Sequence, residues 1–254
     1  MFTIYGNFGS DKPKKEFFKL AKQTGFTGAT LWWSDKYGDS NFRENPRQAR
    51  NAGLHVDNVH APYDGINDIW LDNQDGEALT NNYFKIVEDC ANYQIPTMVF
   101  HVSTGNAPPP FNEIGLNRIK RLVEKAEKHD VNIAFENLKK VAYLEYVLNN
   151  INSPRAGFCY DTGHHNCYCP QLDLLAQYGS RLMALHLHDN DGTADQHLLP
   201  LEGTIDWAVT MHKLAKTGYM GPLTFELRNK EGLPFVAFFN QVYECGKKLE
   251  VLRV

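Results

Sequence analysis

The chain has 254 residues, 43% of them hydrophobic, and is therefore long enough to bury a full core. Its 26 lysines and arginines stand against 30 aspartates and glutamates, giving a formal net charge of -4. This balance argues against a protein that mainly holds a nucleic-acid backbone. The N-terminus lacks a signal-peptide pattern and no segment approaches about 18 uninterrupted apolar residues, so we expect a cytoplasmic protein without a membrane span.

Eight short apolar segments alternate with segments of helical periodicity. The predicted strands are 2–8, 28–33, 55–61, 97–103, 132–137, 156–161, 181–188 and 222–228. The clearest helical pattern follows the fourth strand, where Ile119, Leu122, Val123 and Ala126 share one face. Strands alternating with such helices predict a parallel sheet, and eight of them close into a barrel of about 250 residues. We therefore expect residues 1–254 to form a single (β/α)8 TIM barrel domain of the α/β class.

Side chains that commonly bind metals stand at the ends of most predicted strands. In chain order they are His60, His101, Glu136, Asp161, His164, His186, His188 and Glu226, with Asp195 and His197 after the seventh strand. In a parallel barrel all strands point their C-terminal ends at one face, where residues remote in sequence converge. Imidazoles and carboxylates without thiolates are typical of a catalytic Zn, Mn, Co or Fe site with open positions.

Side-chain alternation puts these residues on the strand faces that are expected to point into the barrel. Counting in twos groups Val56 and Asn58 with His60, Val99 with His101, Ala134 with Glu136, Cys159 with Asp161, Ala184 with His186, and Thr224 with Glu226. Strands of a parallel barrel are covered on both faces, so an inward ionisable side chain is unusual. Crowded carboxylates cannot all stay ionised unless a divalent cation neutralises them. The pattern therefore predicts a metal site at the barrel mouth.

The competing interpretation is a set of structural histidines and solvated carboxylates. A single histidine at a strand end is more often a hydrogen-bonded core group than a ligand. Repetition at strand after strand makes this interpretation poor for the whole set. His165 and His188 stand beside better candidates, and we expect them to orient those ligands by hydrogen bonds. Trp32 and Trp33 end the second strand, where core packing and a wall for a sugar ring are both open.

These strand-end residues resemble the xylose isomerase-like barrel superfamily over nearly the whole chain. That superfamily includes sugar and sugar-phosphate isomerases and epimerases, inosose dehydratases, and the endonuclease IV family. Resemblance to the epimerases implies one Mn, Mg or Co ion held by Glu136, Asp161, His186 and Glu226. Resemblance to endonuclease IV implies three zinc ions held by that set together with His60, His101, His164, Asp195 and His197. All nine positions are filled in this chain, so more than one ion is possible.

The resemblance implies a metal-dependent isomerase or epimerase acting on a sugar or sugar phosphate. Such an enzyme removes a proton beside a carbonyl through a metal-stabilised enediolate. Glu136 and Glu226 are the expected acid and base, and Trp32, His164 and Arg228 the expected substrate contacts.

Three alternatives remain: a zinc-dependent abasic-site endonuclease, a lyase or dehydratase of the same family, and a binding protein that has lost the chemistry. A nuclease needs clustered cations and wedging side chains in the mouth loops. This chain offers Lys139, Lys140, Arg43 and Arg228 there, and otherwise aspartates and asparagines. We therefore expect a small sugar or sugar phosphate as the partner, rather than nucleic acid or a membrane.

Overall fold

The structure is a computed structural model that describes residues 1–6, 13–35, 41–230 and 232–253. All eight predicted strands are present: β1 Phe2–Tyr5, β2 Gly28–Trp32, β3 His55–His60, β4 Thr97–Phe100, β5 Asn132–Glu136, β6 Ala156–Asp161, β7 Leu182–His186 and β8 Leu223–Phe225. Residues 7 and 8 of the first predicted strand lie outside the described residues.

The strands form one parallel sheet in the order β7-β6-β5-β4-β3-β2-β1-β8. The ring closes between β7 and β8 through a parallel bridge from Leu187 to Phe225. There the N–H of Leu187 donates to the carbonyl of Thr224 over 2.8 Å. The predicted (β/α)8 barrel is therefore confirmed.

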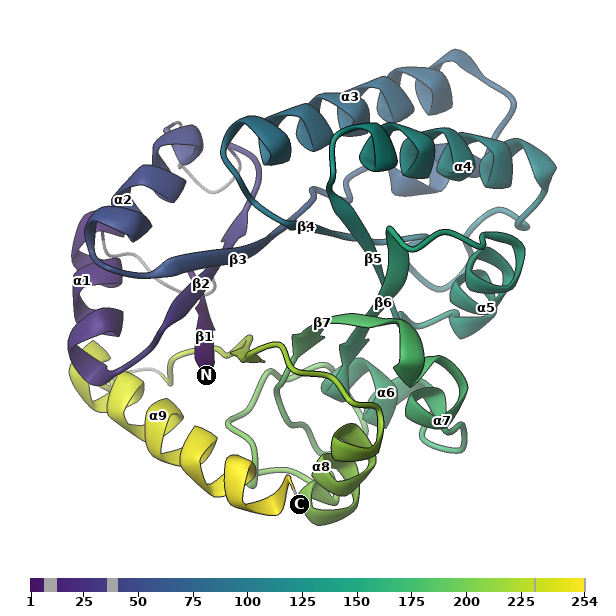
Figure 1. The fold of residues 1–254 in the computed structure, drawn as a ribbon. Helices are drawn as coiled ribbons and strands as arrows, with labels where there is room; N and C mark the ends of the chain where they lie inside the picture. The colour runs from purple at the N-terminus through teal and green to yellow at the C-terminus, as the bar shows by residue number, and fades with distance from the viewer. Residues whose placement is uncertain (7–12, 36–40, 231, 254) are drawn as a thin grey trace.

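Helices connect the strands and form an outer ring around them (Figure 1). They are α1 Lys14–Thr24, α2 Asn45–Asn51, α3 Gln74–Asn92, α4 Glu113–Lys128, α5 Val141–Asn150, α6 Thr162–Tyr168, α7 Leu174–Tyr178, α8 Trp207–Lys216 and α9 Phe235–Leu252, with short 3-10 helices η2 Phe42–Glu44, η3 Ile66–Trp70 and η4 Gly179–Arg181. The predicted apolar face of α4 is buried. Asn112 caps this helix, because its side chain accepts the N–H of Gly115 over 3.1 Å. None of the helices in the described residues is long and apolar enough to span a membrane.

Two separate apolar clusters reflect the two faces of the strands. The larger cluster lies between strands and helices, whereas the smaller one comprises Val99, Ala134, Cys159 and Ala184. These four residues come from four neighbouring strands and fill the barrel interior, as side-chain alternation predicts.

Alternation fails in β3, where Val56 belongs to the larger cluster instead of the barrel interior. The register between β2 and β3 shifts after Ala29, which pairs with Val56, whereas Thr30 pairs with Asn58. Asp57 is therefore an extra residue in the strand. Such a bulge reverses the parity of the residues before it, so the prediction for Val56 is wrong.

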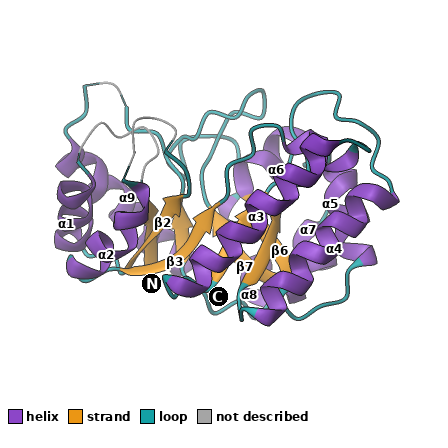
Figure 2. Cartoon of the chain, turned by 90° about the horizontal axis from the view of Figure 1, so that it is seen from above, coloured by secondary structure: helices purple, strands orange, loops and turns teal. Residues whose placement is uncertain are grey.

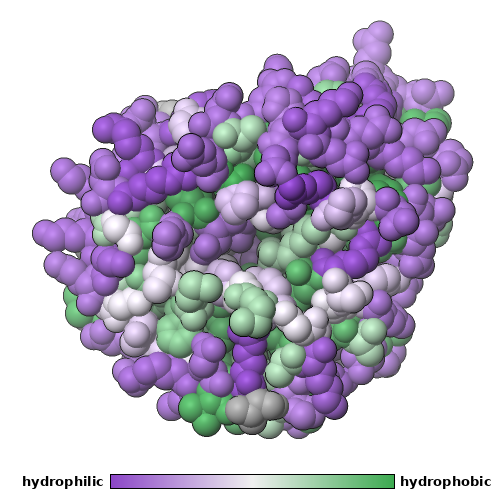
Figure 3. All heavy atoms as spheres, in the orientation of Figure 1, coloured by the Kyte–Doolittle hydropathy of each residue, from purple (hydrophilic) through white to green (hydrophobic). Residues whose placement is uncertain are grey.

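The strands all point toward the face where the longer loops gather, and both chain ends lie on the opposite side (Figure 2). In the view of Figure 3, hydrophilic side chains cover most of the outer helices, and hydrophobic ones surface in smaller groups between them. The loop face therefore receives the C-terminal ends of all eight strands, where the candidate residues were expected to meet.

Candidate metal centre

Glu136, the last residue of β5, lies at the middle of the cluster and is 1% exposed. Its Oε2 lies 3.2 Å from Nε2 of His60 and 3.1 Å from Nε2 of His101. Its Oε1 lies 3.1 Å from Nδ1 of His164 and 3.4 Å from Nδ1 of His186. Imidazoles delivered by four different segments thus surround one buried carboxylate.

A second group gathers around His186 at the end of β7. Its Nδ1 lies 2.9 Å from Oε2 of Glu226, 3.4 Å from Oε1 of Glu136 and 3.8 Å from Oδ2 of Asp161. The side chain of His186 is fully buried, and among the described residues neither ring nitrogen makes a hydrogen bond of good geometry, although Nδ1 lies within ion-pair distance of the carboxylates. A buried polar group without a partner is costly and calls for an ion or ligand. Three carboxylates converging on one imidazole nitrogen are an arrangement expected of ligands around a common cation.

A third group forms around Asp195, which belongs to the loop after β7. Its Oδ2 lies 3.1 Å from Nε2 of His197 and 3.4 Å from Nε2 of His164. Nδ1 of His188 is 3.8 Å from Oδ1 of Asp195, and the rings of His188 and His197 stack with centroids 4.0 Å apart. This group therefore combines strand-end residues with residues of a loop.

Hydrogen bonds to the backbone set the tautomers of two imidazoles. Nδ1 of His60 lies 2.8 Å from the carbonyl of Ala61, and Nδ1 of His197 lies 3.0 Å from the carbonyl of Glu226. A carbonyl only accepts, so each Nδ1 carries the proton and each Nε2 faces a carboxylate. A lone pair opposite a carboxylate needs a proton or a cation between them. Backbone acceptors of this kind commonly orient the histidine ligands of metals.

Electrostatics also indicate that the cluster needs positive charge. Burial raises the pKa of the Glu226 carboxyl, but His186 and His197 outweigh it and bring this pKa down to about 2. Burial likewise opposes ionisation of Glu136, yet neighbouring imidazoles hold its pKa well below the usual value. Burial lowers the pKa of His164, but Asp161, Asp195 and Glu136 raise it well above the usual value. The carboxylates thus stay ionised only beside cationic partners, which a divalent ion would replace.

The ligand atoms are close enough to hold metal ions. Among the described residues, five groups of three side chains have their ligand atoms within 4.8 Å of one another: His60, His101 and Glu136; Glu136, Cys159 and His186; Glu136, Asp161 and His164; Asp161, His186 and Glu226; and His188, Asp195 and His197. Together these groups contain all nine residues that the sequence placed in a metal site. Glu136 and Asp161 each belong to more than one group, so neighbouring ions would share carboxylate ligands.

Side chains that the sequence analysis did not single out join the ends of neighbouring strands. The side-chain amide of Asn137 donates to the carbonyl of Asp161 and accepts its N–H, both over 2.8 Å. The hydroxyl of Thr162 donates to the carbonyl of His188 over 2.7 Å and accepts its N–H over 3.0 Å. Each side chain extends the backbone ladder past the strand ends and fixes the adjacent ligand. The only sequence signal is their position directly after Glu136 and Asp161.

Of the two histidines expected to orient ligands, His188 contacts a candidate ligand and His165 does not. Nε2 of His188 lies 3.0 Å and 3.1 Å from the two carboxylate oxygens of Asp161, as expected for an orienting residue. Its ring packs where a Cβ on Gly163 would come within 1.9 Å, so only glycine fits at that position. His165 instead pairs with the hydroxyl of Tyr160 and the carbonyl of Leu172. It orients none of the candidate ligands through these bonds.

Aromatic rings cover the histidines on one side of the cluster. Trp32 is 8% exposed and stacks on His60 with centroids 5.2 Å apart. Tyr63, which the sequence analysis missed, stacks on His101 at 4.3 Å. Trp33 belongs to the main apolar core, where the packing interpretation holds.

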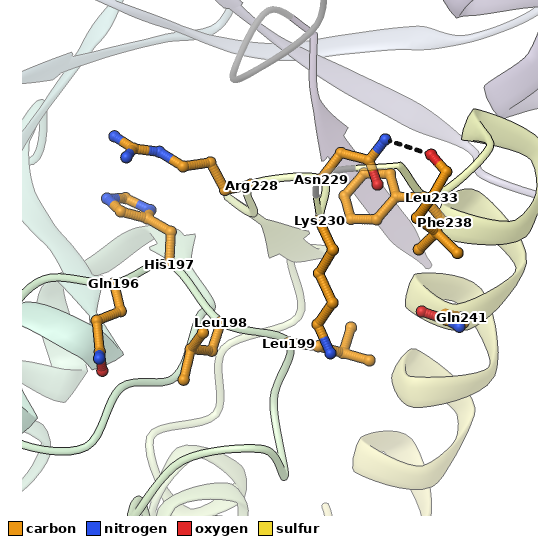
Figure 4. Close-up of a pocket in the computed structure, with 10 residues that line it drawn as sticks. All are labelled: Gln196, His197, Leu198, Leu199, Arg228, Asn229, Lys230, Leu233, Phe238 and Gln241. Carbon is orange, nitrogen blue, oxygen red and sulfur yellow. Dashed lines mark hydrogen bonds between the residues drawn. The ribbon is translucent and has the colours of Figure 1, made fainter.

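The expected substrate contacts His164 and Arg228 lie beside Tyr168 and His197, respectively. The ring of His164 stacks on Tyr168 at 5.7 Å, and Nζ of Lys139 lies 5.4 Å from the centre of the Tyr168 ring. Arg228 is exposed, and its backbone N–H donates to the carbonyl of His197 over 3.2 Å. Arg228 and His197 line a cavity of about 140 Å³ beside the cluster, and their side chains extend in the same direction (Figure 4).

Comparison with known proteins gives two relatives in sequence. The uncharacterized protein y4fM of Sinorhizobium fredii is 32% identical over 142 residues, which cover 55% of this chain and 45% of that protein. An uncharacterized protein of Methanocaldococcus jannaschii is 26% identical over 190 residues, which cover 67% of this chain and 64% of that protein. The chain thus spans less than two thirds of the length of either relative.

Solved structures of two epimerases share the fold. D-psicose 3-epimerase from Clostridium cellulolyticum H10 is 14% identical with a TM-score of 0.80, and the match covers 99% of each chain. A 3-keto-D-glucoside 4-epimerase from E. coli is 19% identical with a TM-score of 0.72, covering 99% of this chain and 100% of that one. The family model described as xylose isomerase-like TIM barrel matches residues 18–253. The chain belongs to the xylose isomerase-like TIM barrel family.

Proposed function

We propose that this protein is a metal-dependent isomerase or epimerase of a sugar or sugar phosphate. The observation that carries the proposal is His186, a fully buried imidazole whose Nδ1 faces three carboxylates. Glu136, Asp161, His186 and Glu226 would hold the principal divalent ion. When bound, the ion stabilises negative charge that develops on the carbonyl oxygen of the substrate.

The surroundings of the two glutamates suggest different duties for them. Both oxygens of Glu136 lie against imidazoles, and its side chain is 1% exposed. Glu226 is 8% exposed, and its Oε2 lies against His186. We assign to Glu226 the removal of a proton from the carbon beside the carbonyl, because its carboxylate is the more accessible. Glu136 would take a proton from the His164 imidazolium against its Oε1, pass it to the other face of the carbon, and keep the imidazoles in place.

The remaining contacts suit a small polar substrate. The aromatic rings of Trp32 and Tyr63 form an apolar wall beside His60 and His101. The cation of Arg228 lines the cavity beside His197, where it can hold a hydroxyl or phosphate group. The two similar epimerases, whose names specify D-psicose and a keto-glucoside, support a sugar with a carbonyl group as substrate.

Exchange of solvent deuterium tests this proposal directly. The protein is incubated in deuterated buffer with a panel of ketoses, keto-glucosides and their phosphates, and label at the carbon beside the carbonyl is followed. We expect exchange with at least one member, because proton abstraction is the first half of the reaction. Exchange should stop when a chelator removes the metal and return when Mn, Co or Zn is added. A protein with full metal content that labels none of these sugars would contradict the proposal.

A second candidate is a zinc-dependent endonuclease acting at abasic sites. The observation that favours it is the third group, in which Asp195 and His197 extend the ligand set beyond one ion. A hydrolase with several ions activates water on one of them. We expect no cleavage of a duplex with one abasic residue, even at stoichiometric enzyme. Zinc-dependent cleavage without sugar exchange would transfer the assignment to the nuclease.

A further inference from the structure

The loop from 187 to 206 carries Asp195 and His197, whereas most of the other candidate ligands sit at strand ends. A strand end is fixed by its neighbours in the sheet, but a loop needs another means of support. The loop leaves β7 and returns to α8, and the bridge between Asp189 and Leu198 joins its two arms, with N–H to carbonyl distances of 2.9 Å in both directions. The contacts that fix the conformation of this loop therefore determine whether Asp195 and His197 are in position before an ion binds.

The carboxylate of Asp189 lies inside this loop and is fully buried. Its Oδ1 accepts the N–H groups of Asn190 at 2.9 Å and Ile205 at 3.3 Å. Its Oδ2 accepts the N–H of Leu201 at 3.1 Å and the indole N–H of Trp207 at 2.7 Å. One side chain thus connects the start of the loop, its far turn and the first residue of α8. A carboxylate satisfied by four donors is a strong fixed point inside a protein.

Backbone strain shows that the loop must be held. His197 has a φ of 51° and Leu201 a φ of 77°, a region that residues other than glycine seldom adopt. Such conformations cost about 1–3 kcal/mol each and persist only where the surroundings impose them. The N–H of Leu201 is one of the four donors to Asp189, so the carboxylate holds one of the strained residues directly.

Close packing leaves the Asp189 carboxylate little room to move. A Cβ on Gly203 would come within 2.2 Å of Oδ1 of Asp189 and 2.3 Å of the carbonyl of Asn190. Asn190 in turn donates from its side chain to the carbonyl of Gly163 at 2.9 Å, which links the loop to the start of α6 beside His164. The path from Asp189 to the third group is therefore continuous through hydrogen bonds and packing.

We propose that Asp189 is a positioning residue that preforms the third group, so that Asp195 and His197 bind a second cation of the proposed metal centre. The inference rests on the proposed function only in taking the cluster to be a metal centre. The side chain of Asp189 acts through the loop and is not itself a ligand. Because the other ligands stand on strands, loss of Asp189 should weaken one cation site and spare the other.

Asp189→Asn is the informative variant, because it preserves the volume of the side chain. The amide keeps one acceptor oxygen and places an NH2 group against two of the four donors. Asp206→Asn is the matched control. It removes the same charge from the same loop, but asparagine can still cap α8 by accepting the N–H of Val209, as Asp206 does over 3.0 Å.

The variants are compared by titrating the metal-free proteins with Co²⁺ and following its absorption spectrum. We expect the wild type to bind cobalt in two separable steps, and His197→Ala to identify the step that belongs to the loop. Asp189→Asn should weaken that step at least about tenfold, the usual effect of losing a group that orients ligands. The step that belongs to the strand ends, and both steps in Asp206→Asn, should stay within about twofold of the wild type.

Other results of the cobalt titration would contradict either the positioning role of Asp189 or the metal centre itself. Equal affinities in Asp189→Asn and the wild type, or an equal loss in both steps together with a lower Tm, would overturn the positioning role. A wild type that binds no cobalt would instead overturn the metal centre itself. If Asp189→Asn fails to fold, Leu201→Gly added to it provides a second test. Glycine adopts the φ of residue 201 without strain, so the double variant should recover folding and still bind the second cobalt weakly.

Discussion

At the scale of single residues, the nine candidate ligands could be found from the sequence because each stands at a strand end or in the loop after β7. Tyr63, Asn137 and Thr162 could not be found in this way, because aromatic stacking and hydrogen bonds to the backbone produce no regular spacing in the sequence. Strict alternation places Val56 on the wrong face, because the bulge at Asp57 leaves no signal in the sequence. The sequence thus predicted which side chains meet, and the structure added what orients them.

The different surroundings of the two glutamates lead to a prediction for their glutamine variants. Glu226→Gln should lower turnover at least about a hundredfold, the lower end for losing a positioned acid or base. Its metal content should change less than that of Glu136→Gln, because Glu136 contacts four imidazoles. Turnover and bound metal are measured on the same preparations. Full activity in both variants would remove the glutamates from the mechanism.

At the scale of elements, strand and helix positions followed from alternation of apolar segments, and all eight strands lie within the predicted ranges. The predicted ranges run past several observed strands, as for 97–103 against Thr97–Phe100. Beyond these ends the chain turns into the mouth loops, where side chains such as Asn137 replace the ladder. Such endings depend on tertiary contacts that a local pattern does not contain.

The bulge at Asp57 gives a prediction on stability. Burial raises the pKa of the Asp57 carboxyl in the folded protein, although the hydroxyl of Thr3 donates to it and partly offsets this. A carboxyl with a raised pKa destabilises the fold increasingly as pH rises through the range between its unfolded and folded pKa. Asp57→Asn should therefore raise Tm at neutral pH and have a smaller effect near about pH 4. Thermal unfolding at both pH values checks this, and an equal change at both would contradict it.

At the scale of the whole molecule, the barrel brings ligands from the ends of six strands, from α6 and from one loop to a single mouth. Since carboxylates and imidazoles are buried there together, bound metal should stabilise the folded protein by mass action. Removing metal with a chelator should lower Tm, and restoring Mn, Co or Zn should reverse the change. Glu124→Gln, on the exposed face of α4, is a suitable control and should respond to chelator like the wild type. A Tm unaffected by chelator would argue that the cluster is stable without a cation.

The fold-level likeness to sugar epimerases does not fix the reaction, because one barrel supports many chemistries. The function must therefore be argued from the buried set of carboxylates and imidazoles, and the central claim is that this set binds metal. The most direct test is an anomalous difference map from crystals of protein purified without added metal, together with elemental analysis. We predict a strong peak between Glu136, Asp161, His186 and Glu226. A map without a peak there, from protein that is metal-free and fully active in chelator, would contradict the account.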